Sequence, residues 1–161
     1  MNIIKKSLAV VSALFLLAAC ETPTGSSSSA DGSGNVAGGS GLYANAKEIA
    51  PGVIDRVFFD YDSAVITGEG QGTLERQAAW MKQNPNVSVT VEGHCDERGT
   101  REYNLALGER RAAAAKKYLV GLGVASSRIS TISYGKERPA IIGSDESAWA
   151  QNRRAVTVIG N

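Results

Sequence analysis

A Gly- and Ser-rich segment, residues 21–45, limits the part of this 161-residue chain that can build a hydrophobic core. The segment holds six Gly and six Ser with almost no apolar side chains, a composition typical of a flexible tether. The residues after it suffice for one core, since a domain of this size buries about two thirds of its unfolded surface. The sequence therefore predicts a tether at residues 20–45 and one globular domain at residues 46–161.

The N-terminus has the pattern of a secretory signal. Lys5 and Lys6 precede an apolar stretch at residues 7–19, which ends directly before Cys20. This stretch has 13 residues, whereas a membrane-spanning helix takes about 20. The sequence Leu-Ala-Ala-Cys that ends at Cys20 resembles the bacterial lipobox, in which a peptidase cuts before the Cys and the Cys is acylated. We predict a signal peptide at residues 1–19 and a lipidated Cys20, with ordinary secretion as the alternative.

The location follows from the same resemblance to lipoproteins. Acyl chains anchor a protein firmly when two or three are attached, since each buried methylene contributes ~0.8 kcal/mol. Glu21 stands where an Asp is the usual signal for retention in the inner membrane. The resemblance therefore implies a lipid anchor in the outer membrane, with the domain facing the periplasm.

The charge of the chain argues against nucleic acid as a partner. The 17 Lys and Arg residues nearly balance the 16 Asp and Glu residues, for a net charge of +1. They are scattered singly and in pairs, whereas a nucleic-acid-binding domain carries a basic face.

Apolar periodicity within the globular part predicts alternating strands and helices. Four segments have the length and the β-branched or alternating pattern of strands: 53–59, 87–91, 129–134 and 155–159. Two segments have helical spacing of apolar residues: 67–83 and 106–122. This order predicts an α/β (α+β) sandwich in which a mixed four-stranded sheet carries the helices on one face.

The second predicted helix places a charge beside its apolar stripe. Arg111 lies about 40° from the centre of that stripe, whereas Arg110 points to the opposite side. A buried guanidinium without a partner costs several kcal/mol, so Arg111 is expected to meet anionic groups. The alternative is a side chain that reaches past the apolar face to solvent.

Acidic residues follow the first two predicted strands. The period of a strand places Asp60 with Asp62 on one face, and His94 with Asp96 on another, with Cys95 pointing the opposite way. The alternative for each of these acidic residues is a structural role, in which the carboxylate stabilises a turn or caps a helix.

Residues 93–112 combine a G-H-x-D-x-x-G turn with an N-x-x-L-x-x-x-R-A helix, and residues 133–139 and 152–155 continue the pattern. The chain here resembles the OmpA-like peptidoglycan-binding domains, and the similarity covers residues 53–160. About twenty nearly contiguous residues in order are far more specific than a short motif.

The resemblance implies a ligand and a site. The ligand of the family is the diaminopimelate of the peptidoglycan stem peptide, whose free end carries an ammonium and a carboxylate. Asp96 corresponds to the residue that takes the ammonium and Arg111 to the residue that grips the carboxylate. The remaining residues that the resemblance places in the site are Asp62, Arg98, Asn104 and Leu107. Lipid-anchored members of the family also imply TolB as a protein partner, and TolA as a second one.

Two alternatives, a hydrolase and a nucleotide-binding protein, are weaker. A periplasmic lipoprotein hydrolase would use His94 with Asp62 and Asp96, but one His and separated acids are few ligands for a metal site. The glycines at residues 68–72 lack the further Gly of a dinucleotide fingerprint, because Thr73 stands in its place. We therefore predict a binding protein without catalytic residue, metal ion or cofactor.

Overall fold

A four-stranded mixed sheet forms the centre of the computed structural model, which describes residues 42–43 and 46–160. Its strands lie in the order β3–β6–β4–β5. β6 runs antiparallel to both of its neighbours, whereas β4 and β5 are parallel. The strands are β3 (Arg56–Phe58), β4 (Val89–His94), β5 (Ile129–Gly135) and β6 (Arg154–Ile159). A short hairpin of β1 (Glu48–Ala50) and β2 (Val53–Ile54) precedes them.

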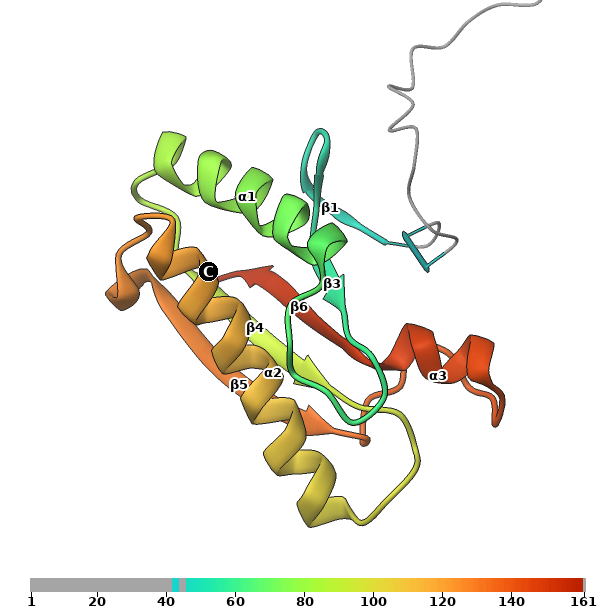
Figure 1. The fold of residues 1–161 in the computed structure, drawn as a ribbon. Helices are drawn as coiled ribbons and strands as arrows, with labels where there is room; N and C mark the ends of the chain where they lie inside the picture. Colours follow the sequence, from blue (N-terminus) through green and yellow to red (C-terminus); the bar gives the residue numbers. More distant parts are fainter. Residues whose placement is uncertain (1–41, 44–45, 161) are drawn as a thin grey trace, which may run out of the picture. The chain divides into compact units, whose positions relative to one another are not determined.

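Two helices cover one face of this sheet, α1 (Gly68–Gln83) and α2 (Arg101–Gly121), as Figure 1 shows. Each begins at a threonine cap, because the Thr67 hydroxyl accepts from Gly70 N and the Thr100 hydroxyl accepts from Tyr103 N. The start of α1 confirms the predicted one, but α2 begins five residues before the predicted Ala106. A 3₁₀ turn, η2 (Ser126–Arg128), leads from α2 to β5.

The hydrophobic core fills the space between the two helices and the sheet. It consists of Val57, Phe59, Leu74, Ala78, Met81, Val89, Val91, Ala112, Ala115, Leu119, Val124, Ile129 and Ala155. The predicted fold class, a mixed sheet with helices packed on one face, is therefore confirmed. Within the described residues, none of the helices is long and apolar enough to cross a membrane.

Three elements differ from the prediction. The predicted strand 53–59 is interrupted at Asp55, whose N–H donates to Lys47 O in the hairpin while its carbonyl accepts from Thr157 N in β6. β1 was not predicted, and neither was α3 (Glu146–Asn152), a seven-residue helix that Asp145 caps. Figure 1 shows α3 at the beginning of β6, away from α1 and α2.

Two glycines bring α2 into backbone contact with the sheet. A Cβ on Gly93 of β4 would lie 1.8 Å from the carbonyl oxygen of Gly108 in α2, and a Cβ on Gly108 would lie 2.3 Å from Ser133 Oγ. Only residues without a side chain allow this approach. Because Arg111 lies one turn after Gly108, the contact also sets the position of Arg111 above the end of β4.

Candidate functional site

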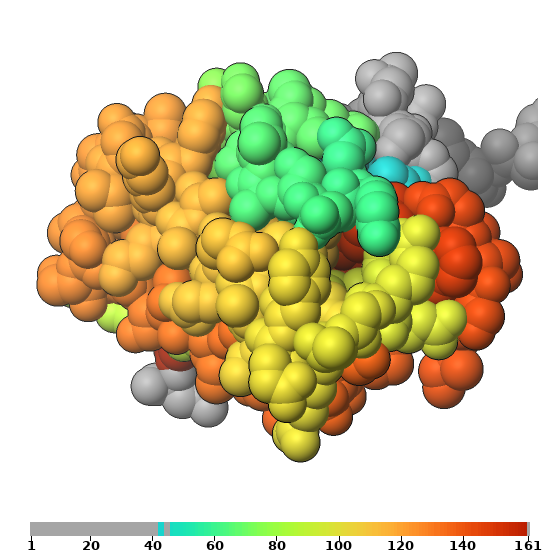
Figure 2. Space-filling view, turned by 60° about the horizontal axis from the view of Figure 1, so that its bottom comes forward, coloured from blue at the N-terminus to red at the C-terminus, as the bar shows by residue number. Residues whose placement is uncertain are grey.

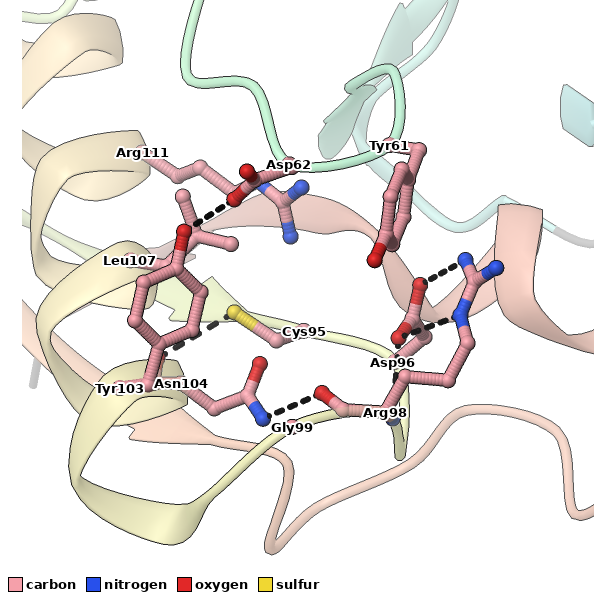
Figure 3. A pocket seen from close by; sticks show the side chains of 10 residues that line it. All are labelled: Tyr61, Asp62, Cys95, Asp96, Arg98, Gly99, Tyr103, Asn104, Leu107 and Arg111. Carbon is pink, nitrogen blue, oxygen red and sulfur yellow. Dashed lines mark hydrogen bonds and ion pairs between the residues drawn. The ribbon is translucent and has the colours of Figure 1, made fainter.

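A cleft of about 170 Å³ lies at the end of the sheet where β3 and β4 finish. Figure 2 shows it as a hollow between the green surface of residues 59–67, the yellow surface of α2 and the yellow-green surface of residues 95–100. The residues that line it, drawn in Figure 3, are Tyr61, Asp62, Cys95, Asp96, Arg98, Gly99, Tyr103, Asn104, Leu107 and Arg111.

Arg111 forms the basic side of the cleft. Its side chain is 0% exposed, so the alternative that it reaches solvent is wrong. The partners are backbone carbonyls: Nε donates to Ser63 O (2.8 Å), Nη1 to His94 O (2.9 Å) and Nη2 to Asp60 O (3.1 Å). The expected anionic partner is thus replaced by three carbonyl dipoles. Burial lowers the pKa of Arg111, although a guanidinium stays charged at neutral pH.

Asp96 forms the acidic side, opposite Arg111 in Figure 3. It is 5% exposed, and Arg98 donates to it three times: from the backbone N–H (3.1 Å) and Nε (3.2 Å) to Oδ1, and from Nη2 (2.6 Å) to Oδ2. Arg153 Nη1 lies 3.6 Å from Oδ2. Burial alone would raise the pKa of Asp96, but the hydrogen bonds from Arg98 and the charges of both arginines outweigh it and lower the pKa.

Arg98 lies between two aromatic rings at the rim of the cleft. Its guanidinium carbon is 4.2 Å from the centroid of Tyr61 and 4.0 Å from that of Trp149 in α3. Stacking of this kind holds a planar cation in place without removing it from solvent. The Trp149 indole N–H also donates to Glu97 Oε1 (3.1 Å), which fixes the ring against the loop.

Asp62 and Asn104 brace the two loops of the cleft. Asp62 has a left-handed backbone (φ 51°) that Asp tolerates better than most residues, and its carboxylate accepts from the Tyr103 hydroxyl. Asn104 Nδ2 donates to Arg98 O (2.8 Å) and to Thr100 O (3.0 Å), which closes the loop onto the start of α2. Leu107, almost fully buried, supplies an apolar wall.

The structure thus brings together all six residues that the sequence placed in the ligand site: Asp62, Asp96, Arg98, Asn104, Leu107 and Arg111. That they contact a ligand stays a prediction. Cys20, the predicted site of lipidation, lies outside the described residues. Sequence reasoning did not identify Tyr61, Tyr103, Trp149 or Arg153 as part of this region. The only sequence signal for α3 was Asp145, a residue type that often caps the start of a helix.

The predicted side-chain directions at the end of β4 are confirmed for His94 and Cys95, which point opposite ways, and wrong for Asp96, which does not share a face with His94. Cys95 lies in the cleft beside Asp96, whereas the His94 ring packs on the other face of the sheet, 5.5 Å from the Tyr134 ring centroid. The ladder between β4 and β5 shifts register between Gly93 and His94, and β4 ends there. The alternation of a regular strand therefore does not continue to Asp96. Asp60 likewise lies beyond β3 and contributes its carbonyl rather than its carboxylate.

This arrangement does not support the hydrolase alternative. His94 does not line the cleft that holds Asp62 and Asp96, and its ring packs near that of Tyr134 instead. In the part of the chain that the structure describes, no group of three or more His, Cys, Asp or Glu side chains could hold a metal ion. Cys95 is a free, buried thiol whose Sγ donates to Asn104 O (3.3 Å), and burial raises its pKa.

His94 makes the stability of the domain sensitive to acid. Burial, and then the charge of Arg154, lower its pKa from 6.5 to about 3, so the unfolded chain binds a proton that the folded chain does not. Between these two values the free energy of unfolding is expected to fall by about 1.4 kcal/mol for each pH unit of acidification. Urea unfolding at about pH 6.5 and about pH 5 should therefore differ by about 2 kcal/mol. His94 is the only His of the chain, so the His94→Gln variant should lose this slope; an unchanged slope contradicts the assignment.

Comparisons with known proteins agree with the fold. Residues 58–153 match the OmpA family. The peptidoglycan-associated lipoprotein of Rhizobium meliloti is 55% identical over 78% of this chain and 75% of its own, and that of Haemophilus influenzae is 46% identical over 97% and 98%. The crystal structure of the peptidoglycan-associated lipoprotein from Burkholderia pseudomallei has a TM-score of 0.64 and 43% identity, and covers 66% of this chain and 90% of that one. The chain therefore belongs to the peptidoglycan-associated lipoproteins of the OmpA family.

Proposed function

We propose that this protein binds peptidoglycan non-covalently, through the diaminopimelate of the stem peptide, and so links the outer membrane to the cell wall. The observation that carries the proposal is the pair of Asp96 and Arg111. These two buried charges of opposite sign face one cleft, and each is held by other groups: Asp96 by Arg98 and Arg153, Arg111 by three carbonyls. The names of the relatives, peptidoglycan-associated lipoproteins, support the association with peptidoglycan.

The two ends of the cleft match the two charges of the ligand. The free end of diaminopimelate bears an ammonium and a carboxylate on one carbon, which requires an acid and a base on opposite sides of a small site. A guanidinium has five N–H donors, more than the three that Arg111 gives to carbonyls, so it can also grip a carboxylate. Asp96 takes the ammonium, and Leu107 packs against the methylene groups that join the charged end of diaminopimelate to the rest of the peptide.

The other predicted residues complete the site. Asp62 and Arg98 lie at the rim, where they contact the ligand backbone, and Asn104 holds the loop that carries Arg98. The site binds and releases its ligand without a chemical step, so no catalytic residue, metal ion or cofactor enters the proposal.

Pull-down with purified sacculi tests this function. Wild type should sediment with sacculi that contain diaminopimelate, and Asp96→Asn should remain in the supernatant, because Asn keeps the shape of the side chain but not its charge. Glu75→Gln is a matched control, since it removes one carboxylate from the exposed side of α1. Equal sedimentation of wild type and Asp96→Asn contradicts the proposed site.

The anchor and the partners belong to the same proposal. Residues 1–19 are removed as a signal peptide, Cys20 carries the acyl chains that enter the outer membrane, and residues 20–45 tether the domain, which faces the periplasm. The lipobox-like sequence before Cys20 and the lipoprotein names of the relatives support this reading. The protein then acts in the Tol–Pal system for envelope integrity and cell division, with TolB as a partner and TolA as a second one. Mass spectrometry of the mature chain tests the anchor, which requires an acylated Cys20 at its N-terminus.

A further inference from the structure

Arg153 joins three segments behind the cleft without lining it. Its Nε donates to Phe59 O at the end of β3 (3.0 Å), and its Nη2 donates to Glu146 Oε1 in α3 (2.7 Å). Its Nη1 lies 3.6 Å from Asp96 Oδ2 and makes no hydrogen bond within the described residues. The side chain is 9% exposed, so this charge is held where water screens it poorly.

The position of Arg153 follows from the backbone on both sides of it. It ends α3, where its N–H donates to Trp149 O (3.0 Å), and directly precedes β6. Its carbonyl accepts from Phe59 N (2.9 Å), which extends the ladder between β3 and β6 by one residue. The guanidinium is therefore fixed by the sheet, by α3 and by its own two hydrogen bonds.

Arg98, the other cation at Asp96, is held in a different way. Its side chain is 30% exposed and reaches the carboxylate from the rim. Its three hydrogen bonds occupy most of the acceptor positions of Asp96. An ammonium that binds Asp96 must share or replace some of these bonds, whereas the buried contact from Arg153 remains.

We propose that Arg153 is a positioning residue, the fixed counter-charge that keeps the Asp96 carboxylate ionised and oriented toward the cleft while a cationic ligand group is bound. This inference rests on the proposed function. It assigns a role to α3, which carries no residue of the cleft itself. The other charged or titratable groups around Asp96 come from the neighbouring loops, α2 and α3: Tyr61, Asp62, Cys95, Glu97, Arg98, Tyr103, Arg111 and Glu146.

The first test is the titration of the Asp96 carboxyl by NMR in the ligand-free protein. The Arg153→Met variant should titrate at a higher pH than wild type, because a favourable charge is lost. Arg76→Met, which removes a cation from the exposed side of α1, should leave the midpoint unchanged. A folded Arg153→Met protein with the wild-type midpoint overturns the proposal.

Glu146→Gln provides an independent variant that leaves Arg153 in place. Glu146 is 65% exposed, so its replacement should not disturb folding. Loss of this anion frees the charge of Arg153 to act on Asp96, and the midpoint should move to lower pH. A midpoint that stays or rises contradicts the role of Arg153 even where Arg153→Met does not fold.

The second test is the affinity for a diaminopimelate stem peptide as a function of pH. Arg153→Met should bind about tenfold more weakly at neutral pH, and its affinity should fall at a higher pH on acidification. Arg153→Lys should recover part of the affinity at neutral pH and part of the wild-type pH profile, because it keeps the charge. A uniform loss with an unchanged pH profile indicates a purely structural role and overturns the proposal. If wild type does not bind the peptide, the proposed function fails, while the carboxyl titration still decides the role of Arg153.

Discussion

The Arg111→Ala variant is expected to lose at least about 30-fold in affinity for diaminopimelate-containing stem peptide, because the partner of a charged ligand group is removed from a desolvated site. Three carbonyls also lose their donor, and the buried one of His94 costs about 1–3 kcal/mol when it is left unsatisfied. The variant should therefore unfold at a lower temperature as well. Calorimetric titration at low temperature, on protein shown to be folded by circular dichroism, measures the affinity separately from the stability.

Arg110→Ala is the matched control for this result. Arg110 is the next residue of α2 but is exposed, so its loss should leave both affinity and stability close to those of wild type. A role of Arg111 confined to holding Ser63, His94 and Asp60 together predicts another pattern. Under that role the folded fraction of Arg111→Ala binds as tightly as wild type, and the ligand stabilises both proteins against heat to the same extent.

Gly93→Ala is expected to have the largest effect on stability. The new Cβ would lie 1.8 Å from the Gly108 carbonyl oxygen, which belongs to backbone and cannot move aside as a flexible side chain could. Overpacking in cores costs about 1–3 kcal/mol when side chains can adjust, so displacement of α2 from β4 should cost more. Urea unfolding should show a loss of over about 3 kcal/mol, or no folded protein at all.

Gly72→Ala separates this steric effect from a general effect of replacing glycine. A Cβ at Gly72, within α1, meets its nearest atom at 3.8 Å, and Ala favours a helix by about 0.5–1 kcal/mol over Gly. This variant should be as stable as wild type or more stable. If Gly93→Ala unfolds at the same urea concentration as wild type, the backbone contact does not determine the packing of α2.

The sequence predicted those parts of the fold that depend on local periodicity. Apolar spacing identified α1 and most of α2, and strand-like segments identified β4, β5 and β6, each within a few residues. The helical wheel placed Arg111 beside the apolar stripe of α2, but it left open whether the side chain is buried or reaches solvent. The hydrogen-bond partners of Arg111 could not be predicted, because carbonyls from residues far apart in the chain, such as Asp60 and His94, become partners only after folding.

The parts that failed depend on tertiary contacts. α3 has seven residues and no apolar stripe of its own, so apolar periodicity does not indicate it. Its link to the cleft becomes visible only in the contact of Trp149 with Arg98 and in the hydrogen bond from Arg153 to Phe59 O. Asp96 shares the cleft with Cys95 rather than a face with His94, because β4 ends at His94 and its ladder with β5 shifts register there, which alternation in one strand cannot show.

The most direct test of the Asp96 and Arg111 site is titration of wild type with two peptides that differ in one carboxylate. One contains diaminopimelate and the other contains lysine, which keeps the ammonium but lacks the terminal carboxylate. Wild type should prefer the diaminopimelate peptide by at least about 30-fold, and Arg111→Ala should bind both peptides with similar weak affinity. If wild type binds the two peptides equally, or if Arg111→Ala keeps the preference, Arg111 does not recognise the ligand carboxylate and the proposed site is wrong.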